Sequence, residues 1–240
     1  MRVGSLFSGI GGFDLGLERA GMEIAWQVEI DNYCRRVLAK HWPHVKRYSD
    51  IREVDPHELE PVDLVAGGPP CQPFSIAGRR TGIADERWMW PEFARVVRGV
   101  RPRWVLFENV AGLANDPVAF GAILGDLHQL GFDAEWSLVS ACSMGAPHVR
   151  RRLFIVAYTR GAGLQGLHEA GRGEHLQPTA EALRRHWEAE PQVDRVAYGV
   201  PRRLVRDELR ALGNAVVPQV AQWLGERILE AERDSECATT

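Results

Sequence analysis

A single thiol stands in a loop that can continue neither a strand nor a helix. The stretch Gly67–Ser75 reads GGPPCQPFS and follows the apolar run 62–66, so Cys71 lies among three prolines just beyond an expected strand. Prolines fix the backbone φ angle and remove hydrogen-bond donors, which makes the loop stiff. Ligands of open α/β sheets bind beyond the carboxyl ends of the strands. We therefore interpret Cys71 as a nucleophile; the alternative is a small buried residue, which free cysteines usually are.

Glycines mark a second loop, between the first expected strand and the first expected helix. Gly9, Gly11 and Gly12 let backbone amides approach a ligand closely. Glu29 lies where dinucleotide-binding folds place the acid that accepts hydrogen bonds from ribose hydroxyls, 20 residues after Gly9. The pattern indicates an adenosine-containing ligand, although Asp14 replaces the last glycine of the dinucleotide fingerprint. A tight turn with a surface glutamate is the alternative.

Two further acids could serve a site on the same rim. Asp50, with Ile51, could add a contact beside an adenine amino group, or it could be a solvated turn residue. Glu108 follows the expected strand 104–107 and faces the same rim as the Cys71 loop. Partial desolvation would raise the pKa of Glu108 and equip it to hold or donate a proton. A helix-capping acid is the alternative.

Three consecutive arginines, Arg150 to Arg152, precede the last expected strand. Alternate residues of a strand share a face, so Arg150 and Arg152 point one way and Arg151 the other. The two guanidinium groups on one face could hold a phosphate, a base oxygen or Glu108. Nearby cations would also lower the pKa of Cys71. A solvated run of charges is the alternative.

Strand-like and helix-like segments alternate along the first 158 residues. Strands joined by crossing helices run parallel, so the alternation predicts an α/β fold with a mostly parallel, doubly wound, Rossmann-like sheet. The expected strands are 2–7, 22–28, 63–66, 104–107, 134–139 and 153–157. The expected helices are 14–20, a helix capped by Asn32 that stops before Pro43, 86–99, 117–130, and a last helix that follows Pro218 and ends near 229.

The pattern changes after residue 158. Residues 161–173 contain five glycines and few apolar side chains, so we expect 159–203 to be a short irregular region. Residues 204–231 are expected to return to the main domain, 1–158, and the polar segment 232–240 to be a flexible tail.

Composition limits the class of protein. The 240 residues carry a net charge of −3 and 45% hydrophobic residues, which suits a globular protein and does not by itself indicate a nucleic-acid binder. Four scattered cysteines have no metal-type spacing, so we expect no metal and reduced thiols, as in a cytoplasm. No apolar run is long enough to span a bilayer, and the N-terminus lacks signal-peptide features, so we expect no membrane association.

Five motifs occur in a specific order: FSGIGGF at 7–13, GPPCQ at 68–72, ENV at 108–110, the arginines at 150–152, and GNAVVP at 213–218. Together they resemble the ordered motifs of DNA cytosine-5 methyltransferases, over residues 1–158 and 204–230. The proline-cysteine loop followed by the ENV triplet makes the resemblance specific. His148, where the family usually has glutamine, and Ala215, where serine is common, depart from the pattern.

The resemblance implies a fold that binds S-adenosylmethionine, with the C-terminal helix packed beside the first strand. It implies that Cys71 attacks carbon 6 of a flipped-out cytosine, that Glu108 holds the ring nitrogen and exocyclic amine, and that Arg152 lies nearest the base. The implied catalytic residues are Cys71, Glu108, Arg150 and Arg152. The implied cofactor contacts are Phe7, Ser8, Gly9, Gly11, Gly12, Glu29, Ile30, Asp50, Ile51, Gly68, Pro70, Asn214, Ala215 and Val216, and the nucleic-acid contacts are Gln72, Ser75, Arg79 and Arg80.

The expected partner is double-stranded DNA, methylated by a cytoplasmic monomer, with a cognate restriction endonuclease as a further potential partner. Family members usually carry a long target-recognition domain where this chain has 159–203, so we expect reduced sequence recognition. Compact forms of this kind resemble solitary or phage-encoded enzymes. Two alternatives stay open: methylation of a cytosine in transfer RNA, and a cofactor-binding partner subunit without turnover.

Overall fold

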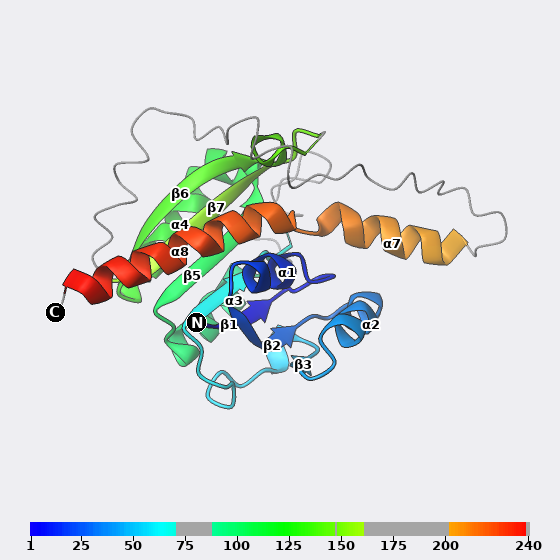
Figure 1. Cartoon of the computed structure of the whole chain (residues 1–240), viewed down its shortest axis with the longest axis horizontal. Helices are drawn as coiled ribbons and strands as arrows, with labels where there is room; N and C mark the ends of the chain where they lie inside the picture. Colours follow the sequence, from blue (N-terminus) through cyan, green and yellow to red (C-terminus); the bar gives the residue numbers. More distant parts are fainter. Residues whose placement is uncertain (71–87, 147, 161–201, 239–240) are drawn as a thin grey trace.

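A seven-stranded sheet forms the centre of the computed structural model, which describes residues 1–70, 88–146, 148–160 and 202–238 (Figure 1). The strand order is β3-β2-β1-β4-β5-β7-β6. The strands are β1 (Arg2–Leu6), β2 (Glu23–Val28), β3 (Lys46–Tyr48), β4 (Leu64–Gly67), β5 (Trp104–Val110), β6 (Phe132–Ser140) and β7 (Arg151–Thr159). The helices are α1 (Gly12–Arg19), α2 (Asn32–His41), α3 (Trp90–Val100), α4 (Pro117–Gln129), α7 (Arg202–Asn214) and α8 (Pro218–Ala238). The predicted α/β fold with a mostly parallel sheet is confirmed.

One strand departs from the parallel pattern. β7 runs antiparallel to both neighbours, β5 and β6, whereas the pairs from β3 through β5 are parallel. Only residues 141–150, with a short 3₁₀ turn at Ala141–Met144, join β6 to β7. A parallel pairing needs a crossover of about a dozen residues or more, so this short connection forces an antiparallel return. The predicted mostly parallel sheet allows for such a strand, but the sequence pattern did not show that it is β7.

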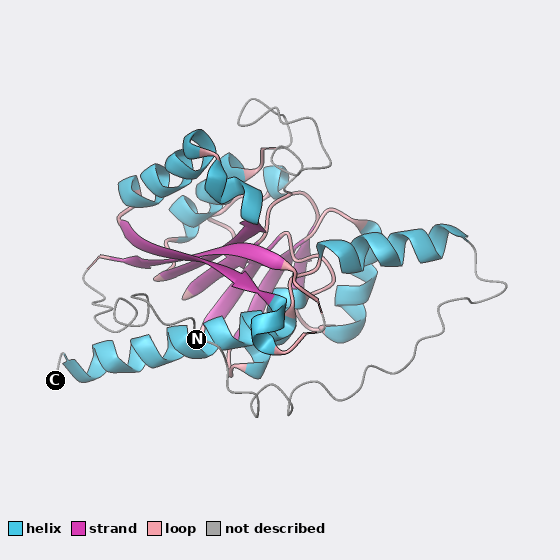
Figure 2. Cartoon of the chain, turned by 90° about the horizontal axis from the view of Figure 1, so that it is seen from above, coloured by secondary structure: helices cyan, strands magenta, loops and turns pink. Residues whose placement is uncertain are grey.

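Helices cover both faces of the sheet (Figures 1 and 2). On one face, α1 and α8 bury Leu17 and Leu224 in one apolar cluster. On the other face, α3 and α4 bury Phe93 and Ile123 in a second cluster. This three-layer arrangement leaves the ends of the strands as the place where loops from different parts of the chain can meet.

Two glycines bring the C-terminal segment against the first helix. A Cβ atom on Gly12 would lie 2.3 Å from the carbonyl oxygen of Val216, and one on Gly16 would lie 2.4 Å from that of Pro218. Only glycine permits such close approach of two backbones. The segment before α8 therefore lies beside the glycine loop that precedes α1, as the family resemblance implied.

The start of α2 differs by one residue from the sequence-based expectation. Asp31, and not Asn32, is the N-cap: its side chain accepts hydrogen bonds from the amides of Tyr33 and Cys34, at 2.8 and 3.1 Å. Arg47 of β3, a short strand that the sequence pattern did not reveal, donates to the Trp42 carbonyl at 2.6 Å. This bond fixes the C-terminal end of α2 to the sheet edge.

The C-terminal region is more helical than expected. α7 begins within the predicted irregular region, and α8 continues to Ala238 through most of the segment predicted to be a flexible tail. Glu232 accepts a hydrogen bond from the Trp104 indole at 2.9 Å and forms an ion pair with Arg103, which attaches this end of α8 to the body. Sequence polarity alone did not reveal these partners, because they lie far away in the chain. None of the helices in the described ranges is long and apolar enough to cross a membrane.

Candidate active site

The carboxyl ends of β1, β2, β4 and β5 surround a cavity of about 300 Å³. Its lining residues are Phe7, Gly9, Glu29, Ile30, Asp31, Cys34, Gly68, Pro69, Pro70, Glu108, Val110, Arg150, Arg152, Arg210, Ala211 and Asn214. The structure thus places predicted cofactor contacts and predicted catalytic residues around one space. A cavity of this size, with a few convergent polar groups, is typical of a small-molecule site.

The glycine loop enters this cavity in an unusual backbone conformation. Phe7 has a φ angle of +53°, in the left-handed region that side-chain-bearing residues seldom adopt, and Gly11 follows at +89°. The hydroxyl of Ser8 donates to the Ser5 carbonyl at 3.2 Å, and the amide of Gly11 donates to the Ser8 carbonyl at 2.9 Å. Such strain persists where surrounding contacts enforce it, and it is concentrated at functional sites.

Glu29 holds the glycine loop to the end of β2. Its carboxylate accepts hydrogen bonds from the amides of Gly9 and Asp31, each at 2.7 Å, and the residue is 9% exposed. Burial raises the pKa of Glu29, and the two amide hydrogen bonds oppose that shift. A carboxylate has about four acceptor positions, so Glu29 can still accept a hydrogen bond from the hydroxyl group of a ligand in the cavity. Glu29 therefore organises the loop and remains available to a ligand.

Beneath the loop lies a buried polar network that sequence reasoning missed. Asp14 is completely buried, and it accepts hydrogen bonds from the Ser5 hydroxyl at 3.0 Å and the Gln27 amide at 2.7 Å. Burial raises the pKa of Asp14 to about 6, against the lowering effect of these two bonds. Asp14 lies between the apolar Phe13 and Leu17 on the inward side of α1, and this placement was the available sequence signal. The network links β1, α1 and β2, the elements that flank the glycine loop and Glu29.

On the opposite wall, Glu108 pairs with an arginine. Its carboxylate lies 3.1 Å from Arg152 Nε, and the residue is 8% exposed. Burial raises the pKa of Glu108 to about 7, while the charges of Arg152 and Arg150 act in the lowering direction. A Cβ atom on Gly68 would lie 2.7 Å from Glu108 Oε2, so the absence of a side chain at residue 68 gives the carboxyl group room. Glu108 can therefore hold or release a proton near neutral pH.

Arg150, just before β7, and Arg152, in β7, reach different partners. Arg152 meets Glu108, and Arg150 donates to the Ala215 carbonyl at 2.8 Å. Arg151 is exposed, as the alternation of side chains predicts. Arg150 thus holds the segment before α8 against the cavity, and its predicted catalytic role stays a prediction.

Asn109 is a second residue that the predicted site did not include. It is buried; its side-chain amide donates to the Pro69 carbonyl at 3.2 Å, and its side-chain oxygen accepts from the Val110 amide at 2.9 Å. The end of β5 is thereby fixed to the chain two residues before Cys71. The predicted residues Cys71, Gln72, Ser75, Arg79 and Arg80 lie outside the described residues.

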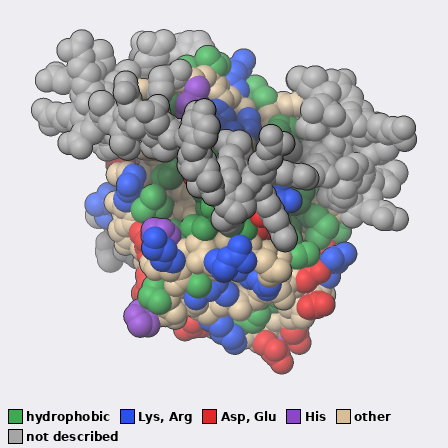
Figure 3. All heavy atoms as spheres, turned by 90° about the vertical axis from the view of Figure 1, so that its right-hand side faces the viewer, with side chains coloured by type: hydrophobic (Ala, Val, Ile, Leu, Met, Phe, Trp, Pro, Cys, Tyr) green, Lys and Arg blue, Asp and Glu red, His purple; other side chains and the backbone are tan. Residues whose placement is uncertain are grey.

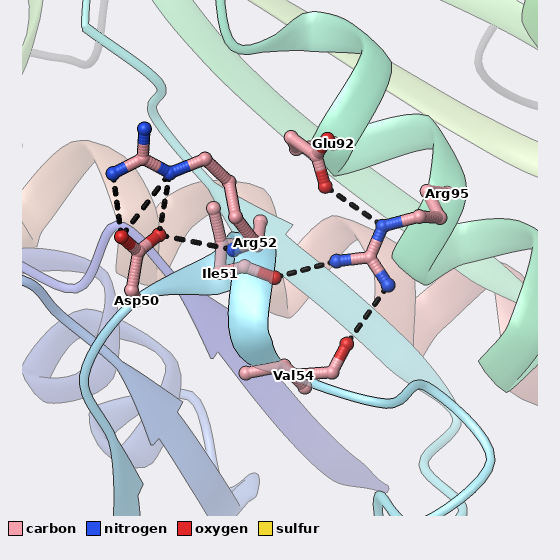
Figure 4. Close-up of polar contacts among 6 residues, drawn as sticks. All are labelled: Asp50, Ile51, Arg52, Val54, Glu92 and Arg95. Carbon is pink, nitrogen blue, oxygen red and sulfur yellow. Dashed lines mark hydrogen bonds and ion pairs between the residues drawn. The ribbon is translucent and has the colours of Figure 1, made fainter.

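The predicted adenine contacts, Asp50 and Ile51, are not among the residues that line the cavity. Both Asp50 carboxylate oxygens accept hydrogen bonds from Arg52, and Arg95 donates to the carbonyl groups of Ile51 and Val54 at 2.5 and 2.8 Å (Figure 4). The Arg52 interaction holds the pKa of Asp50 below its usual range. Their role as cofactor contacts stays a prediction.

The segment before α8 closes the cavity from the C-terminal side. Asn214 lines it, and Val216 lines a small hollow together with Glu108, Arg150 and Arg152. Arg210 also lines the cavity and forms an ion pair with Asp31. Residues four apart on a helix share a face, so the position of Arg210, four residues before Asn214, was a signal that sequence reasoning did not use.

Charges of both signs lie on the face at the right of Figure 1 (Figure 3). Lysine and arginine side chains lie across the middle of this face, and acidic side chains lie toward its lower edge. On α2, Arg36 and Lys40 are exposed cationic residues. A chain with a net charge of −3 can thus present local positive charge, which matters for contact with phosphate groups.

Comparisons with known proteins agree with this geometry. Residues 1–193 match the family described as C-5 cytosine-specific DNA methylase. The chain is 36% identical over 163 residues to the Type II methyltransferase M.FnuDI of Fusobacterium nucleatum, covering 67% of this chain and 47% of that protein. It is 35% identical over 184 residues to M.AquIA of Picosynechococcus sp., covering 67% and 73%. M.NgoBI of Neisseria gonorrhoeae is 34% identical, with 64% and 49% covered. The chain thus spans about half the length of M.FnuDI and M.NgoBI.

Solved structures show the same fold. A DNA modification methyltransferase encoded within a prophage of E. coli, as its description has it, aligns with a TM-score of 0.56 and 28% identity, over 66% of this chain and 47% of that chain. The Dnmt2 methyltransferase of S. pombe aligns with a TM-score of 0.57 and 22% identity, over 73% and 57%. At that identity, the second similarity concerns the fold alone.

Proposed function

Because the chain belongs to the C-5 cytosine-specific DNA methylase family, we propose that it transfers a methyl group from S-adenosylmethionine to carbon 5 of cytosine in double-stranded DNA. The observation that carries this proposal is the Glu108–Arg152 pair on the rim of the cavity. A carboxyl group with a pKa of about 7, next to the chain that leads into Cys71, suits protonation of a pyrimidine ring.

The residues present fit the cofactor. Glu29 lines the cavity and keeps acceptor capacity for ribose hydroxyls, while Phe7 and Ile30 supply apolar surface. Gly9 and Asn214 complete the walls from the two ends of the chain. When bound, S-adenosylmethionine supplies an electrophilic methyl group. The protein's part is to bind this group and to make the base nucleophilic.

Activation of the base falls to Cys71 together with Glu108 and Arg152, the latter two of which line the cavity. A cytosine must leave the helical stack before these groups can reach it. The Cys71 thiolate forms a bond to ring carbon 6, while Glu108 holds a proton at the ring nitrogen and Arg152 orients the Glu108 carboxyl group. Carbon 5 thereby gains electron density and takes the methyl group. Loss of the proton from carbon 5 then releases Cys71 and restores the aromatic ring.

The proposal also covers which segment recognises the target DNA and the setting in which the enzyme works. Residues 159–203 act as a reduced target-recognition region, and the segments 1–158 and 204–231 form the catalytic domain. The names of the Type II relatives support a restriction–modification setting with a cognate endonuclease. The proposed enzyme works as a cytoplasmic monomer on DNA.

A mechanism-based trap tests the reaction. Duplex DNA pools containing 5-fluorocytosine are incubated with the protein and S-adenosylmethionine, and covalent complexes are resolved on a denaturing gel. The fluorine at carbon 5 cannot be eliminated, so wild-type protein is expected to remain attached to DNA, whereas Cys71→Ser forms no adduct. Labelled-methyl transfer to ordinary DNA and to transfer RNA runs in parallel. Transfer to RNA alone, or no adduct with any pool, contradicts the proposal.

A further inference from the structure

One wall of the cofactor cavity comes from α7, far from the other walls in sequence. Arg210, Ala211 and Asn214 lie on this wall, while most other lining residues belong to the strand ends between Phe7 and Arg152. In Figure 1, α7 extends above α2 on the same side of the molecule. Whatever holds α7 in place therefore affects the shape of the cavity.

The Arg210–Asp31 pair joins α7 to α2 at this wall. The two oxygens of Asp31 have separate tasks: Oδ1 accepts from the amides of Tyr33 and Cys34 as the N-cap of α2, and Oδ2 meets the Arg210 guanidinium. Burial tends to raise the pKa of Asp31, but the amides and Arg210 outweigh it and hold the pKa below its usual value. Asp31 is therefore a fixed anion that can bind α7.

The same residue is connected to the glycine loop. The Asp31 amide donates to Glu29 at 2.7 Å, and Glu29 accepts from the Gly9 amide at 2.7 Å. Polar contacts thus run from Arg210 through Asp31 and Glu29 to Gly9. A change in the position of Arg210 acts on the residues that are proposed to hold the ribose.

Other contacts fix the segment that follows α7, but they do not replace this one. Arg150 donates to the Ala215 carbonyl, and the Val216 backbone packs against Gly12. The first contact joins the segment to Arg150, which lines a small hollow with Glu108 and Arg152. The second joins the segment to the first residue of α1. The Arg210–Asp31 pair instead bridges α7 and the start of α2, both of which contribute residues to the cavity wall.

We propose that Arg210 and Asp31 are cofactor-positioning residues whose ion pair holds α7 closed over bound S-adenosylmethionine. The inference rests on the proposed function for the identity of the ligand. Binding and closure reinforce each other, because a ligand that contacts the closed wall stabilises it, and the closed wall strengthens binding. The Arg210 side chain is 59% exposed and that of Asp31 25%, so the effect is modest and sensitive to salt.

Titration calorimetry of the full chain with S-adenosylmethionine and S-adenosylhomocysteine tests the pair. Arg210→Ala is expected to raise Kd by about threefold to fivefold, the size of an exposed ion pair. Asp31→Asn should act in the same direction, because asparagine keeps the helix cap but loses the charge. Arg227→Ala is the matched control, since Arg227 forms an exposed ion pair with Glu230 within α8.

A structural defect and a positioning role give different results. Arg210→Lys should restore most of the affinity, Arg210→Ala should raise the KM for the cofactor without lowering kcat at saturation, and the double variant should lose less than the sum of the two single losses. If wild type binds and Arg210→Ala binds as tightly as Arg227→Ala, or if the two losses add fully, the positioning role is overturned. If wild type itself binds neither ligand, the proposed cofactor is wrong, and the positioning role is overturned with it.

Discussion

Two buried glutamates, Glu29 and Glu108, lie at the ends of two strands of the same sheet, separated by β1 and β4, and face one cavity, yet they have different partners. Glu29 follows β2 and accepts hydrogen bonds from two backbone amides, those of Gly9 and Asp31. Glu108 lies near the end of β5 and pairs with the guanidinium of Arg152. Burial is the leading cause of a raised pKa at both, and it brings that of Glu108 to about 7.

The difference shows how one residue type can serve two purposes. Backbone amides cannot move without the loop, so Glu29 is a fixed acceptor that also shapes the glycine loop. At Glu108, burial outweighs the opposing charges of Arg152 and Arg150 and brings the pKa to about 7, so the carboxyl group can gain and lose a proton near neutral pH. The wall that contains Glu29, the cofactor wall, is therefore suited to binding. The wall that contains Glu108, the base wall, is suited to proton transfer.

The substitution Glu108→Gln is expected to have the largest effect. Loss of a positioned proton donor should lower the rate of methyl transfer by roughly 100-fold or more, while the Kd for S-adenosylmethionine stays near the wild-type value. Single-turnover methylation and titration calorimetry measure the two quantities. A large loss of cofactor affinity in this variant would show that the two walls do not have separate functions.

Alanine substitutions at Gly12, which packs against Val216, and at Gly68, which lines the cavity beside Glu108, should differ in their effect on stability. Gly12→Ala places a Cβ 2.3 Å from the Val216 carbonyl oxygen, which belongs to the backbone and cannot move aside, so we expect a loss of about 1–3 kcal/mol in the free energy of unfolding. The Cβ of Gly68→Ala would be closest to the flexible end of Glu108, 2.7 Å from Oε2, and would lie 3.6 Å from its backbone carbonyl oxygen. Gly68→Ala should lower the free energy of unfolding less than Gly12→Ala does, and it should lower the rate of methyl transfer more. Chemical denaturation and initial rates measure both, and equal stability losses would contradict the comparison.

Glu29→Gln tests the cofactor wall. The glutamine amide group would face one of the two backbone N–H donors, leaving that donor without an acceptor at a cost of about 1–3 kcal/mol. We expect the Kd for S-adenosylmethionine to rise about tenfold at similar kcat, which corresponds to about 1.4 kcal/mol. Glu18→Gln, on the exposed side of α1, is the control. An unchanged Kd would mean that Glu29 only shapes the loop.

The smallest effect is a shift in pH dependence. Glu108 acts in its protonated form, so kcat/KM should fall as the pH rises through its pKa of about 7. Arg152 lowers this pKa, so Arg152→Ala should raise it and move the alkaline limb to higher pH, on a lower maximum rate. Arg151→Ala changes an exposed neighbour and should leave the limb in place. A shift toward lower pH in Arg152→Ala would reverse the assignment.

Sequence reasoning recovered the parts of the fold that local patterns encode. The alternation of strands and helices predicted the mostly parallel sheet, and the positions of Glu29, Glu108 and Arg152 at strand ends predicted that they would share a rim. It did not recover the antiparallel β7, because strand direction depends on the length of a connection and on which neighbour has a free edge. It also missed Asp14, whose partners Ser5 and Gln27 come together only when β1 and β2 pair.

The sequence by itself determined the chemistry available to this protein: a thiol in a proline-rich loop, a glycine loop, two acids after strands and paired arginines. These follow from residue type and short-range spacing. Only the tertiary structure decided which partner each group has. Amides hold Glu29, a guanidinium holds Glu108, and Arg210 reaches Asp31 from the other end of the chain. The reason is physical, because burial and contact between distant segments set pKa values and cavity walls, and neither is encoded by neighbours in sequence.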